Sequence, residues 1–415
     1  MAADGPGRAL DLDFVRRRFP DAAWRWAFFD NAGGSFVPQS VIDRVTAYMT
    51  ENQVQPGSPA APSQLAAERM VAGECLMAEM IGADADEVMI GPSTTANVFF
   101  LSRALKPLFG TGDEIVVTSL DHEANNGAWR RLANDGIVIR EWTVDPETGV
   151  LDPAALDALL SDRTRLVCFP HCSNVTGAIH DAKAIVTKAH AAGALTCVDG
   201  VAYAPHRALD VKALGADIYL FSLYKTFGPH LGLMYAKRPI FERASGVNHF
   251  FLDGKIPLKL NPGGPNHELT AGLVGIADYI DAVHAHHFPE AQTNLDLNGR
   301  AAKVFSLFHP HEVAIGRRFL DWANGRDDIR LIGPAIMDVR APTFSFVVKG
   351  RKSSDLPAKV AADGVAISNG SFYAWRLMQA LELDPSDGVV RASMLHYNTL
   401  EEVDRLTAAL DKALD

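Results

Sequence analysis

Two residues of opposite charge, Asp199 and Lys225, have the types and the spacing of a cofactor site. Asp199 ends one short apolar run, and Lys225 follows the next apolar run, at 218–223. A helix-sized segment separates the runs, so in an α/β sheet both side chains lie at the carboxyl ends of strands, where ligands bind. A lysine can hold the aldehyde of pyridoxal phosphate as a Schiff base, and a carboxylate can keep its pyridine nitrogen protonated. Either residue alone is more commonly an ordinary polar residue after a strand.

Hydroxyl side chains near this pair could bind the phosphate. Ser222 lies three residues before Lys225, and Thr94 and Thr95 stand between a strand-like run at 87–92 and an apolar helix that reaches Leu105. A strand, small hydroxyl residues and then a helix form the arrangement in which a helix N-terminus binds phosphate. The same pattern also fits a simple helix cap.

Three motifs occur in order between residues 199 and 399, and the likeness that they carry extends over nearly the whole chain. They are Asp199-Gly200 with Ala204-Pro205-His206, then Ser222-x-x-Lys225, and finally Arg391-Ala392-Ser393 followed by Tyr397-Asn398-Thr399. Together they resemble the class V aminotransferases, and specifically the cysteine desulfurase-like group. The resemblance implies pyridoxal phosphate as cofactor and the α/β architecture of fold type I. That architecture has a large domain with a mostly parallel, seven-stranded-type sheet and a smaller C-terminal α+β domain.

The resemblance also implies roles for individual residues. Lys225 would bind the cofactor and move the proton at Cα, Asp199 would maintain the electron sink, and His122 would stack on the ring. Further cofactor contacts are implied for Thr94, Thr95, Asn174, Ser222 and Tyr224, and, across a homodimer with shared active sites, for Gly264, Asn266 and His267. Substrate contacts are implied for Ala32, Gly33, Asn174 and Arg391, with Arg391 gripping a carboxylate, and for Tyr373 as an acid.

The chain departs from that group in one loop of the small domain. Desulfurases need a cysteine nucleophile there, but the matching segment 368–375 contains none, and no cysteine follows Cys197. Tyrosine or serine cannot replace thiolate chemistry. Two cofactor contacts also differ, because Ala202 stands where these enzymes have glutamine and Tyr224 where they have histidine.

The favoured function is therefore a lyase that eliminates a β-substituent of an amino acid, such as a substituent attached through a carbon–sulfur bond. An epimerase, which only removes and returns the Cα proton, and an aminotransferase are the alternatives. A non-catalytic accessory subunit or cofactor sensor is a third class. The retained Lys225, Asp199, His122 and Arg391 argue against it, because a scaffold needs none of their chemistry.

Composition agrees with a soluble enzyme of two domains. Of 415 residues, 48% are hydrophobic and 21% charged, which is ordinary for a globular protein. The net charge of −11 argues against nucleic acid as a partner, and no apolar run approaches membrane-spanning length. No secretory signal is visible and the four cysteines form no Cys-x-x-Cys pair, so we expect a cytoplasmic protein. No metal site is predicted, since His284, His286 and His287 lack acidic or cysteine companions.

Alternating strand and helix patterns over 87–236 predict a mostly parallel, doubly wound sheet. Strands are expected at 87–92, 114–120, 137–144, 165–170 and 195–199, with a helix between the third and fourth. Further helices are expected near 13–19 and at 39–51, 65–81 and 181–192. From about 289 the pattern changes, and Thr399 opens the last helix with a capping box. The predicted domains are 21–288 and 289–415, with an N-terminal arm at 1–20.

Overall fold

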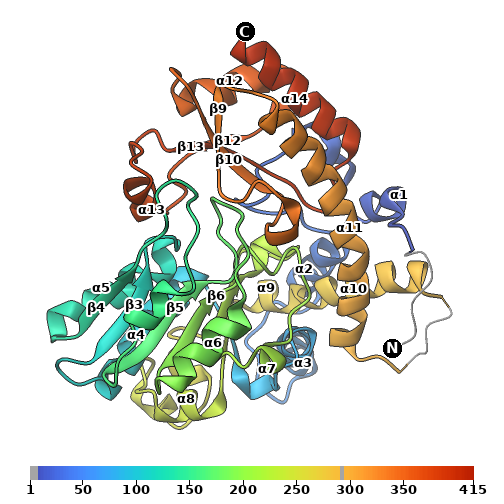
Figure 1. The fold of residues 1–415 in the computed structure, drawn as a ribbon. Coiled ribbons are helices and arrows are strands. Elements are labelled where there is room, and N and C mark those ends of the chain that lie inside the picture. The colour runs from blue at the N-terminus through green and yellow to red at the C-terminus, as the bar shows by residue number, and fades with distance from the viewer. Residues whose placement is uncertain (1–7, 290–293) are drawn as a thin grey trace.

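A seven-stranded sheet is the framework of the larger part of the molecule. The computed structural model describes residues 8–289 and 294–415 (Figure 1). The strands are β2 (Val88–Gly91), β3 (Glu114–Thr118), β4 (Val138–Trp142), β5 (Thr164–Pro170), β6 (Leu195–Asp199), β7 (Ile218–Ser222) and β8 (Gly232–Ala236). Their order is β2-β8-β7-β6-β5-β3-β4, and every neighbouring pair is parallel except those that involve β8. The predicted α/β fold is confirmed.

Both faces of this sheet are covered by helices, as a mostly parallel sheet requires. Alternate strand residues enter two apolar clusters: Val116 and Val198 belong to one, and Ile115 and Cys197 to the other. The first cluster includes residues of α3 (Ala61–Met80), α6 (Ala182–Ala191) and α10 (Val274–His287). The second includes residues of α4 (Thr94–Leu105), α5 (Gly127–Arg130) and α8 (Arg238–Arg243).

Most predicted helices form near their predicted bounds. The observed helices include α1 (Leu12–Arg16), α2 (Gln39–Glu51), α7 (Val211–Leu214) and α9 (His267–Gly272). Helix α3 begins earlier than predicted, because Pro62 is accommodated in its first turn. The prediction of a helix between β4 and β5 is wrong. That segment forms only a short 3₁₀ turn, Ala155–Ala158, because the Asp152 carboxylate accepts from Ala154 N–H at 2.9 Å and forms a local turn in place of a helix cap.

A four-stranded antiparallel sheet forms the C-terminal part. Its strands, in the order β12-β13-β10-β9, are β9 (Ile329–Ile332), β10 (Thr343–Val348), β12 (Ser368–Gly370) and β13 (Val389–Ser393). Helices α12 (Leu356–Ala361), α13 (Trp375–Ala380) and α14 (Leu400–Leu414) accompany it. The predicted capping box of α14 is confirmed, because Thr399 Oγ1 accepts from Glu402 N–H and Glu402 accepts from Thr399 N–H.

One long helix and one early strand connect the two parts. Helix α11 (Leu297–Asn324) runs beside both in Figure 1. Its first half packs in the core of the large sheet, and its second half packs in the C-terminal core. Strand β1 (Ala27–Phe28) pairs with β11 (Val365–Ala366) of the C-terminal part.

The predicted domain boundaries stay a prediction. Residues 1–7 of the predicted arm lie outside the described residues, as do residues 290–293 beside the predicted boundary.

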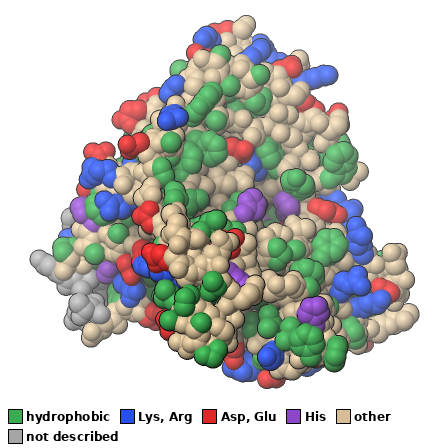
Figure 2. Space-filling model, turned by 180° about the vertical axis from the view of Figure 1, so that it is seen from behind, with side chains coloured by type: hydrophobic (Ala, Val, Ile, Leu, Met, Phe, Trp, Pro, Cys, Tyr) green, Lys and Arg blue, Asp and Glu red, His purple; other side chains and the backbone are tan. Residues whose placement is uncertain are grey.

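The surface gives two further facts about the molecule. Within residues 8–289 and 294–415, no helix combines the length and the apolarity needed to cross a membrane. Acidic and basic side chains are interspersed over the face shown in Figure 2.

The histidines near the end of α10 contact the N-terminal segment, where His286 Nε2 lies 2.9 Å from an Asp11 carboxylate oxygen.

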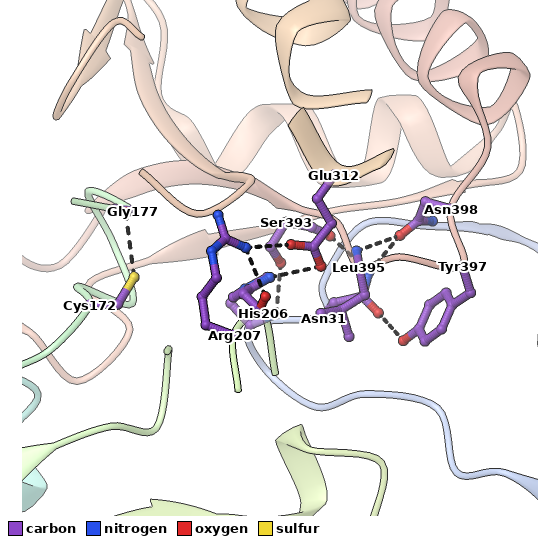
Figure 3. Close-up of polar contacts among 11 residues, drawn as sticks. Asn31, Cys172, Gly177, His206, Arg207, Glu312, Ser393, Leu395, Tyr397 and Asn398 are labelled. Carbon is purple, nitrogen blue, oxygen red and sulfur yellow. Dashed lines mark hydrogen bonds and ion pairs between the residues drawn. The ribbon is translucent and has the colours of Figure 1, made fainter. Parts of the chain in front are cut away.

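A buried charge cluster joins α11 to the loop after β6 (Figure 3). Glu312 on α11 is fully buried, and its carboxylate oxygens lie 3.0 Å from His206 Nδ1 and 3.2 Å from Arg207 Nη1. Figure 3 also shows Asn31, whose side chain donates to the Ser393 carbonyl oxygen at 2.9 Å. The Glu312 contacts fix the loop that follows Asp199 against α11, and the Asn31 bond ties the segment after β1 to β13.

Glu312→Ala should destabilise the protein because it leaves Arg207 without its buried counter-charge. We expect the free energy of unfolding, measured by urea denaturation, to fall by about 3 kcal/mol. Asp321→Ala, at an exposed position on the same helix, is the matched control and should change stability by no more than about 0.5 kcal/mol. Equal effects of the two substitutions would contradict a stabilising role of the cluster.

Candidate functional site

A cavity of about 740 Å³ lies at the carboxyl ends of four parallel strands. It gathers residues that are distant in sequence, because β3, β5, β6 and β7 all end at the same edge of the sheet. The predicted site residues that line it are Thr94, Thr95, His122, Asn174, Asp199, Ser222, Tyr224, Lys225 and Tyr373. The structure therefore brings nine of the predicted site residues together at one edge of the sheet.

Lys225 ends a short 3₁₀ turn directly after β7 and is buried. Burial, reinforced by the positive charge of Arg391, lowers the pKa of its amine to about 8, although Asp199 and Asp30 act in the opposite direction. Among the described residues, no hydrogen bond or ion pair engages its Nζ. A buried amine with a lowered pKa and no partner is well suited to react with an aldehyde.

Asp199 is the last residue of β6, and Asp121 lies in the loop after β3. Asp199 Oδ1 accepts from Val201 N–H at 2.8 Å, and burial raises the pKa of its carboxyl to about 6. Burial, with the nearby Asp199, raises the pKa of the Asp121 carboxyl well above its usual range. Asp199, with a pKa of about 6, is therefore ionised at neutral pH, whereas burial favours the neutral form of Asp121.

Hydroxyl groups meet at the first turn of α4. Thr94 Oγ1 lies 2.8 Å from Ser222 Oγ, and Ser93 caps the helix by accepting from Ala96 N–H at 3.1 Å. Gly232 allows β8 to approach this turn closely, because a Cβ there would lie 2.4 Å from backbone atoms of Ser93 and Thr94. Two hydroxyls beside a helix N-terminus can bind a phosphate.

His122 presents a neutral aromatic ring to the cavity. Its Nδ1 accepts from Ala124 N–H at 3.0 Å. Burial, with the positive charges of Lys225 and Arg391, lowers its pKa to about 3. The ring centroid of Tyr373 lies 5.2 Å from that of His122, and Tyr373 is 75% exposed, so its phenol faces both cavity and solvent.

Arg391 does not line the cavity. One of its terminal nitrogens, Nη2, donates to Asp30 Oδ1 at 2.8 Å, and Nη1 donates to the Asn174 carbonyl oxygen at 3.2 Å. The Phe372 ring covers the guanidinium at 3.7 Å. Ala32 and Gly33 lie beside this network, where Ala32 N–H donates to Ser393 Oγ and Gly33 N–H to the Asp30 carbonyl oxygen. Their predicted substrate contacts stay predictions.

The three residues predicted to reach a partner subunit also lie outside this lining. Asn266 caps α9 by accepting from Leu269 N–H at 3.0 Å, and His267 is the first residue of that helix. Gly264 has a φ of +74°, a conformation that favours glycine. Their contribution to a second active site stays a prediction.

Several lining residues were missed by sequence reasoning, namely Asp121, Glu123, Arg131 and Arg376. Asp121 had a visible signal, since a carboxylate directly before His122 follows the same strand. Arg376 had none, because it reaches the cavity only through the packing of α13 against the large part.

The cavity fits pyridoxal phosphate as a whole. It offers hydroxyls and a helix N-terminus for a phosphate, the Asp199 carboxylate for a ring nitrogen, and the unpartnered Lys225 amine for an aldehyde. The flat face of His122 suits stacking on an aromatic ring.

The sequence of this chain is similar to those of known proteins. The family model for class V aminotransferases matches residues 27–299 and 308–406. An "aminotransferase-like protein FGM3" of Gibberella zeae is 37% identical over 98% of this chain and 99% of its own length. A "cysteine desulfurase-like protein ustD" of Aspergillus flavus is 35% identical over 97% of this chain and 90% of its own.

The fold comparison agrees with the sequence comparisons. The cysteine desulfurase CsdA from Escherichia coli superposes with a TM-score of 0.82 at 25% identity, covering 98% of this chain and 99% of that one. The chain therefore belongs to the class V aminotransferase family and is a pyridoxal-phosphate-dependent enzyme.

Proposed function

We propose that the enzyme eliminates a β-substituent, in particular one bound through sulfur, from an amino acid. The observation that carries this proposal is a cavity with Lys225, Asp199 and His122 beside a loop, 368–375, that has no cysteine. The cysteine that does line the cavity, Cys172, is buried, and burial raises the pKa of its thiol to about 12. Such a thiol stays protonated and is a poor nucleophile, which favours elimination over persulfide transfer.

The residues of the cavity support a specific division of labour. When bound, pyridoxal phosphate withdraws electrons from Cα of the amino acid and so acidifies its proton. Lys225 Nζ takes that proton as general base, since its pKa of about 8 is close to working pH. Tyr373 donates a proton to the departing sulfur. The net reaction of an S-alkyl cysteine with water gives pyruvate, ammonia and a thiol.

A product assay tests the proposal directly. The purified enzyme is offered cysteine and a panel of S-substituted cysteines, and pyruvate and the released thiol or sulfide are measured. Equal amounts of both products are expected. No pyruvate from any member of the panel would contradict elimination. Exchange of the Cα proton in heavy water without product would instead indicate an epimerase, and transfer of amino groups to an oxo acid would indicate an aminotransferase.

The assembly is proposed to be a cytoplasmic homodimer in which Gly264, Asn266 and His267 complete the phosphate site of the other subunit. Asn266 and His267 already lie at a helix start, α9, where backbone N–H groups can bind an anion. Mixing inactive Lys225→Ala subunits with inactive His267→Ala subunits should restore partial activity if sites are shared. Failure of every such mixture would contradict sharing.

Cofactor loading should depend on pH with a midpoint near 8. The amine must lose its proton to attack the aldehyde, and the site lowers the pKa of Lys225 to about 8 from its ordinary value of 10.5. The loading rate should therefore rise from pH 7 to 9 and then level off, as followed by visible absorbance after pyridoxal phosphate is added to the stripped protein. Arg391→Gln should move the midpoint upward, because it removes a neighbouring positive charge. A midpoint of about 10 in the unmodified protein would overturn the expectation.

A further inference from the structure

The segment 371–374, which we call the strap, crosses from β12 of the C-terminal sheet to α13 and is tied to the large sheet. Asn174 Nδ2, from the loop after β5, donates to the Phe372 carbonyl oxygen at 3.0 Å. The Glu123 N–H, from the loop after β3, donates to the Tyr373 carbonyl oxygen at 2.8 Å. Arg376, just beyond the strap, lies 3.4 Å from a Glu123 carboxylate oxygen. Contacts to two separate loops thus hold the strap beside the cavity.

The strap engages two of the side chains that were predicted to contact the substrate, Arg391 and Asn174. The Phe372 ring lies 3.7 Å from the Arg391 guanidinium, and the Asn174 amide donates to the backbone of the same residue. Asp30 and the Asn174 carbonyl oxygen occupy the terminal nitrogens of Arg391. Arg391 Nε is buried and, among the described residues, without a hydrogen-bond partner. The Phe372 ring thus covers one face of the side chain that was predicted to bind the substrate carboxylate.

The backbone of the strap favours a movement of Phe372. Phe372 and Tyr373 have φ values of 51° and 60°, so two consecutive non-glycine residues adopt the left-handed conformation. This conformation is strained for residues with a Cβ and persists only where surrounding contacts hold it. Here the contacts are the hydrogen bonds from Asn174 and Glu123 and the ring on Arg391. Loss of the ring contact would weaken the hold and allow the strain to relax.

We propose that the strap is a cover which the α-carboxylate of the substrate opens by displacing Phe372 from Arg391. This inference rests on the proposed function, since it names how an amino acid enters that site. Charge-assisted hydrogen bonds from a guanidinium to a carboxylate are stronger than its contact with an aromatic face. The exchange also frees the Asn174 side chain toward the cavity. A ligand with the same amine but no carboxylate leaves the strap in place.

Hydrogen exchange of the full-length holoenzyme tests the cover with L-alanine and L-alaninamide as probes. Neither probe has a β-substituent that can leave, and they differ only in the carboxylate. L-alanine should speed exchange of the Glu123 amide and of the amides at 372–376, whereas L-alaninamide should leave them unchanged. Equal exchange with both probes would overturn the proposal. An enzyme that opens for L-alanine but yields no pyruvate from the cysteine panel would contradict only the proposed elimination.

A substitution at Phe372 gives a second, independent readout. Phe372→Ala removes the ring and keeps the backbone carbonyl, so the concentration of L-alanine that half-saturates the spectral change should fall on the order of ten-fold. The value for L-alaninamide should stay the same, and Phe372→Tyr should behave like the unmodified enzyme for both probes. A parallel change for both ligands would mean that Phe372 acts on general access rather than on the carboxylate.

Discussion

Lys225→Ala is expected to abolish covalent retention of the cofactor and to lower kcat/KM for elimination by at least about 10³-fold. The size of the effect follows from the two tasks proposed for one amine, which are to hold the aldehyde and later to move the Cα proton. The groups that would hold the phosphate and the ring, such as Thr94, Ser222 and Asp199, remain in this variant. Pyridoxal phosphate should therefore still bind reversibly, so the loss of activity reports on Lys225 itself.

Borohydride reduction followed by peptide mass analysis measures the covalent part, and pyruvate formation measures the catalytic part. Lys183→Ala, at an exposed position on α6, is the matched control and should leave both unchanged. Added methylamine should restore some activity to Lys225→Ala if the missing group is a base. Retention of pyridoxal phosphate on a different lysine after reduction would contradict the assignment.

The sheet was predictable because its signals are local. Strands such as β5 and β6 are apolar runs that are buried on both faces, and such runs are recognisable without knowing their neighbours. Helices α6 and α14 carry their own start signals in Asp181 and Thr399, both of which cap as predicted. The segment after Asp152 has a comparable cap signal, but the Asp152 carboxylate bonds to Ala154 N–H and forms a turn, so the same reasoning failed there.

The candidate site also has one part that local sequence patterns predict and one part that they do not. The positions of Asp199, Ser222 and Lys225 could be predicted because each ends a strand or lies just after one, and the topology of a parallel sheet brings such ends together. The surroundings of Arg391 could not be predicted. Its partners Asp30, Asn174 and Phe372 come from three distant segments, and no local pattern in the sequence records that they meet. Tertiary packing alone decides that Arg391 lies behind the strap rather than in the cavity.

Asp199→Asn should also lower kcat/KM severely, although the asparagine side chain has almost the same shape as aspartate. The carboxylate is needed as a negative charge beside a protonated ring nitrogen, and asparagine keeps the size but not the charge. Loss of a buried counter-charge costs about 3–5 kcal/mol, which corresponds to a fall in kcat/KM of roughly 10²- to 10⁴-fold. Pyruvate formation from the best S-substituted cysteine measures it, and the visible spectrum shows whether the cofactor is still bound.

Asp121→Asn is the comparison for Asp199→Asn. Both carboxyl groups line one cavity, but the cavity favours the neutral form of Asp121. Burial and the nearby Asp199 raise the pKa of the Asp121 carboxyl well above its usual range and so favour its neutral form, and an amide should therefore replace it with less than about a ten-fold change in kcat/KM. Asp199, with a pKa of about 6, is ionised above that pH, and a cation bound beside it lowers the pKa further. The ratio of the two effects therefore reports which carboxylate carries the charge. Equal losses from both substitutions would mean that the cavity needs two negative charges, and the assignment of Asp199 as the sole ring partner would be wrong.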